Sequence, residues 1–339
     1  LPELAGTLHV ALGLSRHAHA RILSLDLEAV RAAPGVVAVL TAADIPGENN
    51  CGPVLHDDPI LADGTVSYLG QPVFAVVATS RELARQAAAL AKSGDVVRYE
   101  PLEAVLTARA ARDRQQYVLP PLHLVRGDPA AKIAAATHRL TGEFEVGGQE
   151  QFYLEGQIAY AVPKEAAGML VYSSTQHPSE MQQVVAHMLG WPAHRVLCEC
   201  RRMGGGFGGK ESQSAVFACI AALAASRLKR PVKLRADRDD DFLITGKRHD
   251  AVYRYEVGFD GEGRIAGARV EIARAGASPA RGDDDEGQHE ARRERAPRVD
   301  HRFGALPPAS ASARNAEAAS SEARREPPLL SSPMRQLQL

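Results

Sequence analysis

The stretch Met203-Gly204-Gly205-Gly206-Phe207-Gly208-Gly209-Lys210-Glu211 has five glycines in six consecutive positions. Because glycine lacks Cβ, the backbone N–H groups of such a loop can approach a ligand closely and adopt positive φ angles. Residues 195–200 alternate like a strand before the loop, and apolar residues recur at helical spacing over 216–223 after it. A glycine loop between a strand and a helix is a ready seat for an anion or cofactor. A tight turn between closely packed elements would use the same residues.

The loop does not match the common phosphate-binding motifs. In a Walker loop the lysine is followed by Ser or Thr, whereas Glu211 follows Lys210 here. The dinucleotide pattern G-x-G-x-x-G fits Gly204, Gly206 and Gly209, but any glycine-dense loop satisfies it. No acidic ribose partner stands out about 20 residues further on. The motif therefore does not favour nucleotide binding.

The segment Arg202 to Glu211, R-M-G-G-G-F-G-G-K-E, resembles the strongest local signature of the molybdenum-cofactor-binding subunit of the xanthine dehydrogenase/aldehyde oxidase family. Four further segments resemble family motifs in the family's order, and the resemblance covers about residues 1–273. The four segments are Ser67 to Val73 (Y-x-G-Q-P-V), Gln149 to Glu155 (Q-E-H-F-Y-L-E), Ser174 to Gln176 (S-T-Q), and Arg238 to His249 (R-x-E-D-x-x-x-T-G-x-R-H, with Asp240 in place of its Glu).

The resemblance implies an α+β fold in two domains. An N-terminal α/β hammerhead domain is expected over residues 1–105, a charged linker over 106–130, and a truncated molybdenum-cofactor-binding domain over 131–273. Local patterns add detail within the first domain. Residues 72–78 read as a strand, and residues 80–92 read as a helix with Ser80 as its N-cap.

Two local predictions concern the second domain. A capping box from Ser179 to Gln182 predicts the start of a helix that ends at Gly190. The buried face of this helix is predicted to contain Met181, Val184, Val185, Met188 and Leu189. The acidic run at residues 238–241 resembles a metal loop but lacks the glycine and distal glutamate of an EF-hand, so it is predicted to be a solvated turn.

Residues 274–339 differ in composition from the rest of the chain. They contain no Ile, Lys, Thr or Tyr, and only eight of the 66 residues are Val, Leu, Phe or Met. Such a segment cannot bury enough apolar surface to offset its conformational entropy. It is therefore interpreted as a disordered tail or, preferably, as the product of a frameshift in a GC-rich gene. The first residue, Leu1, is not methionine, which suggests a fragment.

Composition restricts the partners and the cellular location. The formal net charge of −1 gives no general electrostatic reason to expect nucleic-acid or membrane partners. The four cysteines show neither C-x-x-C nor zinc spacing. No secretory signal and no apolar run of about 18 residues is present. The sequence is therefore interpreted as that of a soluble, cytoplasmic protein.

The resemblance also implies roles for individual residues. Gln176 corresponds to the glutamine that hydrogen-bonds an oxygen ligand of molybdenum, although from its position alone it could be a polar turn residue. Gly206, Phe207 and Gly208 correspond to the loop that abuts the cofactor, with Phe207 as a packing wall and the Gly208 amide as a donor. Glu211 corresponds to the substrate-facing carboxylate of purine-oxidising members; otherwise it is an ordinary glutamate favoured in a first helical turn. No side chain is expected to bind the metal, because the pterin holds it.

The implied activity is the oxidative hydroxylation of hypoxanthine or xanthine, with water as oxygen source. Iron–sulfur clusters and FAD are expected on a partner subunit or domain, which implies a hetero-oligomer when intact. The family's general-base glutamate (G-x-G-E) and its F-R-G-F-G-G-P-Q segment have no counterpart here, so this chain is expected to contain no catalytic residue and to be inactive alone. The alternatives are a subunit that oxidises aldehydes or other N-heterocycles, and a non-catalytic fragment.

Overall fold

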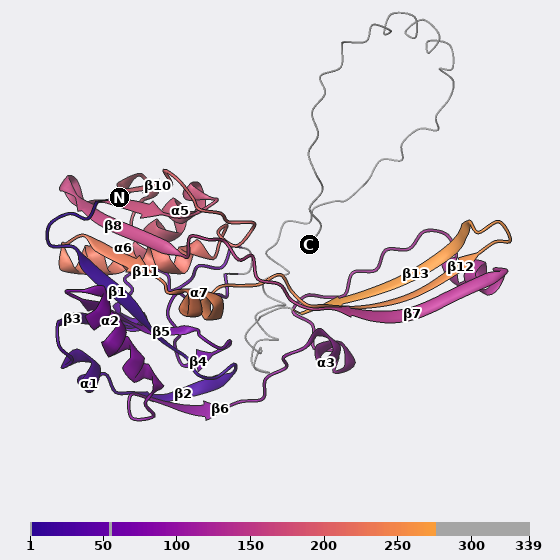
Figure 1. Ribbon diagram of the computed structural model, residues 1–339, viewed down its shortest axis with the longest axis horizontal. Coiled ribbons are helices and arrows are strands. Elements are labelled where there is room, and N and C mark those ends of the chain that lie inside the picture. Colours follow the sequence, from indigo (N-terminus) through magenta and orange to yellow (C-terminus); the bar gives the residue numbers. More distant parts are fainter. Residues whose placement is uncertain (1, 54–55, 276–339) are drawn as a thin grey trace, which may run out of the picture. The chain divides into compact units, whose positions relative to one another are not determined.

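Three β-sheets organise the residues that the computed structural model describes, which are 2–53 and 56–275. The largest sheet has seven strands in the order β10-β9-β8-β11-β1-β5-β3 (Figure 1). Its strands are β1 (Leu8–Leu14), β3 (Val36–Leu40), β5 (Pro72–Ala78), β8 (Ile158–Lys164), β9 (Gly168–Ser173), β10 (Val196–Glu199) and β11 (Val232–Arg235).

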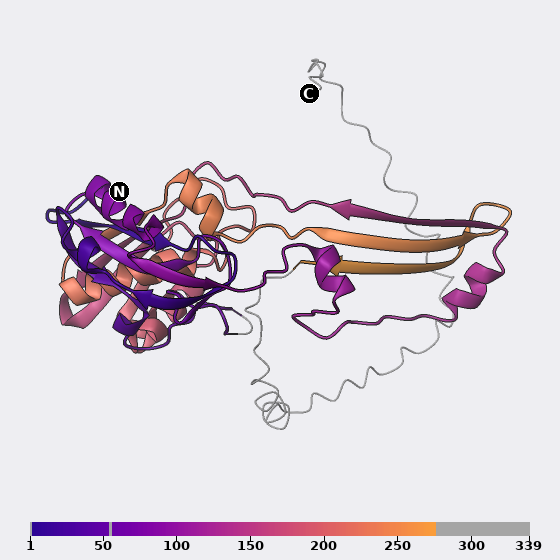
Figure 2. The same cartoon turned by 90° about the horizontal axis from the view of Figure 1, so that it is seen from below.

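Two three-stranded sheets accompany it, with the orders β4-β2-β6 and β13-β12-β7. The first contains β2 (Ala20–Leu25), β4 (Thr65–Val66) and β6 (Val97–Pro101). The second contains the longer strands β7 (His138–Val146), β12 (Ala251–Phe259) and β13 (Ile265–Arg274) (Figure 2). Its central strand, β12, is antiparallel to both β7 and β13.

Helices in the described residues vary from one turn to four. They are α1 (Glu28–Arg31), α2 (Arg81–Ala88), α3 (Ala108–Asp113), α4 (Pro129–Ala134), α5 (Pro178–Leu189), α6 (Ser214–Leu228) and α7 (Arg238–Ile244). None of these helices is long and apolar enough to cross a membrane. The mixture of helices and sheets confirms the predicted α+β class.

The seven-stranded sheet joins segments that are far apart in sequence. Strand β1 pairs in parallel with β11 and antiparallel with β5, so one sheet combines strands from both expected domains. The sheet therefore marks no boundary between the expected ranges 1–105, 106–130 and 131–273, whose limits stay predictions. The prediction of a disordered or frameshifted tail concerns residues 274–339, and residues 276–339 lie outside the described part of the chain.

The predicted strand and helix at residues 72–92 are confirmed. Every residue of β5 is buried, and its alternate side chains enter two different cores: Ala75 and Val77 join one, and Phe74 and Val76 join the other. Helix α2 follows, extended by one short 3₁₀ turn to residue 92. The Ser80 hydroxyl caps it by accepting a hydrogen bond from the Leu83 N–H at 3.3 Å.

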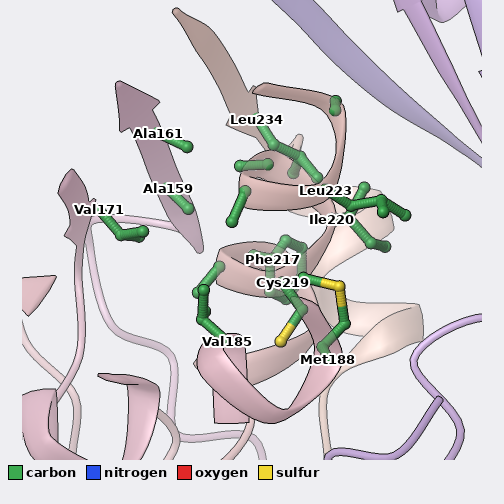
Figure 3. Packing of buried hydrophobic residues seen from close by; sticks show 14 of the residues in the cluster. Ala159, Ala161, Val171, Val185, Met188, Phe217, Cys219, Ile220, Leu223 and Leu234 are labelled. Carbon is green, nitrogen blue, oxygen red and sulfur yellow. The ribbon is translucent and has the colours of Figure 1, made fainter. Parts of the chain in front are cut away.

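Helix α6, which follows the glycine loop, is the centre of the larger core. All of its residues from 214 to 225 are buried, and the helix packs against β8 and β11 on one side and α5 on another. Figure 3 shows Phe217, Ile220 and Leu223 of α6 among side chains from β8, β11 and α5. A helix that is apolar on all sides must be surrounded by other elements, so the position of α6 is fixed by its packing. The C-terminal end of the glycine loop, which leads into α6, is therefore fixed as well.

Helix α5 exists as predicted, but the capping box at Ser179 was wrong. The helix begins at Pro178, whose fixed φ suits the first helical position, and the Thr175 hydroxyl accepts a hydrogen bond from the N–H of His177. Gln182 donates instead to the carbonyls of Ala193 and Val196. The predicted apolar face is buried except for Val184, which is half-buried, and Gly190 ends the helix at φ +65°.

Candidate functional site

The glycine loop follows β10, as predicted, and α6 begins at Ser214, a few residues after the last glycine. Gly205, Phe207 and Gly208 have φ angles of +94°, +52° and +87°. Positive φ is readily available to glycine but strained for Phe207, whose side chain is also 75% exposed. The loop therefore holds an exposed aromatic ring in an unfavourable backbone conformation.

Gln176, in the turn between β9 and α5, is tied to this loop by its side chain and its backbone. Its Oε1 accepts hydrogen bonds from the N–H groups of Gly208 at 2.9 Å and Lys210 at 3.3 Å. Its own N–H donates to the Lys210 carbonyl at 2.8 Å. Because two N–H donors face Oε1, the carboxamide orientation is fixed, and Nε2 is the end that can donate to a ligand.

Gly206 allows this close approach. A Cβ at this position would lie 2.5 Å from Gln176 Oε1 and 2.8 Å from its Cδ, nearer than real Cβ contacts. By contrast, a Cβ at Gly208 would have no neighbour within 4 Å, so the loop has open space beside it there. The glycines therefore serve two different needs, close packing at Gly206 and a positive φ angle at Gly208.

A cavity of about 460 Å³ lies between this loop and the start of α5. It brings together two residues that the sequence singled out, Gln176 and Glu211, both of them exposed. Gly206, Phe207 and Gly208 do not line it. Among residues 2–53 and 56–275, the lining consists of Pro53, Gln176, His177, Glu180, Glu211 and Ser212.

Sequence reasoning did not find four of the residues that line the cavity, namely Pro53, His177, Glu180 and Ser212. Two of these, His177 and Glu180, contact each other. His177 Nδ1 lies 2.7 Å from Glu180 Oε2, and the other carboxylate oxygen, Glu180 Oε1, is buried without a hydrogen-bond partner among the described residues. Their separation of three residues, from the N-cap of α5 into its first turn, was a signal that could have paired them. The exposed carboxylate of Glu211 gives the cavity wall a hydrogen-bond acceptor, which suits a ligand with an N–H group.

A polar network lies beneath the loop, and it overturns one prediction. The acidic run at 238–241 is not a solvated turn: it forms helix α7, and Asp241 is fully buried. Asp241 accepts hydrogen bonds from the Tyr153 hydroxyl at 2.6 Å and from the Gln157 N–H at 2.8 Å. These buried donors supply the interactions that water would otherwise provide to the carboxylate.

The second charge of this network is the Lys210 ammonium, also fully buried. Its Nζ donates to the Glu155 carbonyl at 2.6 Å and to the Ser174 hydroxyl at 2.8 Å. Burial lowers the pKa of Lys210, and the nearby carboxylates of Glu155 and Asp241 oppose that shift. Burial, followed by the hydrogen bond to Asp241, raises the pKa of Tyr153 well above its ordinary value.

The arrangement can bind a polar ligand through hydrogen bonds. The loop is open beside Gly208, and Gln176 presents a fixed amide donor at the edge of the cavity. Among residues 2–53 and 56–275, no group of three or more His, Cys, Asp or Glu side chains is placed to hold a metal ion.

Comparison with known proteins agrees with this description. Residues 111–284 match the molybdopterin cofactor-binding domain, and residues 2–103 match the a/b hammerhead domain of aldehyde oxidase and xanthine dehydrogenase. The chain therefore belongs to the aldehyde oxidase and xanthine dehydrogenase family, with its hammerhead domain followed by a molybdopterin cofactor-binding domain.

The individual relatives include xanthine dehydrogenases and aldehyde oxidases. The chain is 42% identical over 274 residues to a xanthine dehydrogenase of Drosophila subobscura, which covers 80% of this chain and 20% of that protein. It is 43% identical over 268 residues to aldehyde oxidase 2 of Cavia porcellus, which covers 78% of this chain and 19% of that protein. The structure resembles the aldehyde oxidoreductase of Desulfovibrio gigas with a TM-score of 0.70 and 26% identity, covering 80% of this chain and 31% of the other. The chain thus spans about a fifth of the curated relatives' length.

Proposed function

We propose that this chain forms part of a molybdenum hydroxylase that oxidises hypoxanthine or xanthine, with water as the source of oxygen. The observation that supports the proposal is the cavity on which Gln176 and Glu211 meet. The resemblance implies that Gln176 faces the cofactor and that Glu211 faces the substrate. The two residues come from different segments of the chain and line the same cavity. Molybdopterin, when bound, supplies the redox-active metal for this chemistry.

Gln176 is proposed to hold the cofactor as a hydrogen-bond donor. Its Oε1 is engaged by the N–H groups of Gly208 and Lys210, so its Nε2 donates toward an oxygen atom of the bound group. In this structure the Gly208 N–H donates to Gln176, so its action on the cofactor is proposed to be indirect, by fixing the carboxamide. Phe207 is proposed to cover one side of the cofactor with its exposed ring.

Glu211 is proposed to orient the substrate. An ionised carboxylate accepts a hydrogen bond from an N–H of a heterocycle, and a protonated one donates to a ring nitrogen. Purines present both kinds of group, whereas a simple aldehyde presents neither an N–H nor a ring nitrogen. This chemistry favours purines over the alternative of an aldehyde-oxidising subunit.

Further parts of the proposal extend beyond these residues. Electrons are proposed to leave through iron–sulfur clusters and FAD on a partner subunit or domain, within a hetero-oligomer that works in purine catabolism in the cytoplasm. The second candidate, a non-catalytic fragment, would lack both cofactor and turnover.

Glu211→Ala tests the substrate assignment in the purified enzyme that contains this chain. Losing one hydrogen bond to a charged group is expected to lower kcat/KM for xanthine by about 10- to 100-fold. The kcat/KM for benzaldehyde is expected to change less than about threefold, because that substrate has no N–H to lose. Steady-state dye reduction with each substrate measures both values.

Glu82→Ala is the matched control, since Glu82 is likewise an exposed glutamate but lies in the first turn of α2 and does not line the cavity. This variant is expected to leave kcat/KM unchanged for both xanthine and benzaldehyde. An equal fall for xanthine and benzaldehyde in Glu211→Ala would argue against purine recognition by Glu211. A wild-type enzyme that oxidises aldehydes but not xanthine would favour the aldehyde alternative.

A further inference from the structure

Two buried opposite charges bracket Tyr153 beneath the glycine loop. The Lys210 ammonium lies 4.6 Å from the centre of the Tyr153 ring, and the Tyr153 hydroxyl donates to Asp241 at 2.6 Å. Each of the three side chains is at most 1% exposed. Burying an isolated charge is costly, and here each charge has the tyrosine as a partner: the ring faces the ammonium, and the hydroxyl donates to the carboxylate.

The glycine loop rests on the segment that contains this tyrosine, residues 153–157, at three points. The Glu155 N–H donates to the Gly204 carbonyl at 3.1 Å, and Gln157 Nε2 donates to the Gly209 carbonyl at 2.9 Å. Lys210 Nζ donates in the opposite direction, to the Glu155 carbonyl at 2.6 Å. Residues 153–157 therefore hold both ends of the glycine run, Gly204 and Gly209, and also Lys210, which follows it.

Asp241, in helix α7, holds residues 153–157 in place. Besides the Tyr153 hydroxyl, it accepts the Gln157 N–H at 2.8 Å, so one carboxylate binds both ends of this segment. The packing is close: a Cβ at Gly156 would lie 2.9 Å from Asp241 Oδ2. Since Gln157 in turn binds Gly209, a continuous chain of contacts leads from α7 to the loop.

We propose that Lys210 and Asp241 are the positioning residues of the glycine loop, and that they set the conformation in which Gly208 binds Gln176 and Glu211 reaches the cavity. With Lys210 directed inward, the next side chain, Glu211, is exposed at the cavity. The proposal concerns the loop that the proposed function uses, but its test needs neither cofactor nor substrate. The two can therefore fail separately.

Hydrogen exchange of the full 339-residue chain, followed by mass spectrometry, tests the proposal with the variants Lys210→Met and Asp241→Asn. The loop amides of Gly208, Gly209 and Lys210 are hydrogen-bonded, so they are protected while the loop is held. Exchange in residues 203–212 is expected to accelerate at least about tenfold in each variant. Exchange in α6 and β5 is expected to change less than about threefold, because their apolar packing is untouched.

Asp239→Asn is the control, since Asp239 lies on the same helix as Asp241 and is exposed. Hydrogen exchange of residues 203–212 in this variant is expected to match that of the wild type. Tyr153→Phe removes only the bridging hydroxyl and carries the test if Asp241→Asn fails to fold, with an expected acceleration of about threefold in 203–212. Unchanged exchange in 203–212 would overturn the proposal. An equal acceleration in β5 would also overturn it, because that shows a general loss of stability.

Discussion

Replacing Gly206 by Val is expected to reduce the cofactor content of the purified protein to less than about a tenth of the wild-type content. The new Cβ would lie 2.5 Å from Gln176 Oε1, so the Gln176 side chain would have to leave its position between Gly208 and Lys210. The donor proposed to face the cofactor would then be misdirected, and the loop would be pushed away from the β9–α5 turn. Pterin fluorescence and molybdenum per polypeptide measure the effect.

Gly261→Val is the control for a valine at a glycine position, because a Cβ at Gly261 meets nothing within 4 Å. Gly261 lies in the turn between β12 and β13, away from the loop in sequence. This variant is expected to retain its cofactor. A Gly206→Val protein with a full complement of pterin would show that the loop does not seat the cofactor.

Gln176→Glu is expected to lower kcat/KM by about 10²- to 10³-fold while the protein remains folded. A glutamate has the same shape, and one of its oxygens can still accept the N–H groups of Gly208 and Lys210. The other oxygen, however, is an acceptor where the amide had a donor, and it would repel an oxygen atom of the cofactor. Steady-state kinetics together with the pterin content separate an effect on turnover from a loss of cofactor.

The control for this charge change is Gln86→Glu on the exposed side of α2. It is expected to keep wild-type kinetics and cofactor content. If Gln176→Glu retained activity within about threefold of wild type, the donor role of Gln176 would be wrong.

Sequence reasoning predicted elements whose patterns are local. The strand β5 and the helix α2 follow from an uninterrupted apolar run and from a serine cap, both visible without tertiary information. The position of the glycine loop between β10 and α6 likewise followed from periodicity on either side of it. The family signatures then added a prediction that no local pattern contains, namely that Gln176 and Glu211 belong to one site. Both residues line the same cavity, and their roles there stay predictions.

Features that depend on tertiary contacts were missed. Asp241 looked solvated, because three consecutive aspartates usually are, yet the donors that bury it come from residues more than 80 positions earlier. The capping box at Ser179 matched the expected letters, but Pro178 took the first helical position. The buried state of Lys210 could not be foreseen either, since its partner Glu155 is distant in sequence.

The measurement that tests the central claim most directly is the pterin and molybdenum content of the purified, folded protein that contains this chain. Oxidative release of the pterin, read by fluorescence, and metal analysis of the same sample give both amounts per polypeptide. We predict about one pterin and one molybdenum per polypeptide. A folded protein with neither would contradict the assignment of the glycine loop and its cavity as a cofactor site.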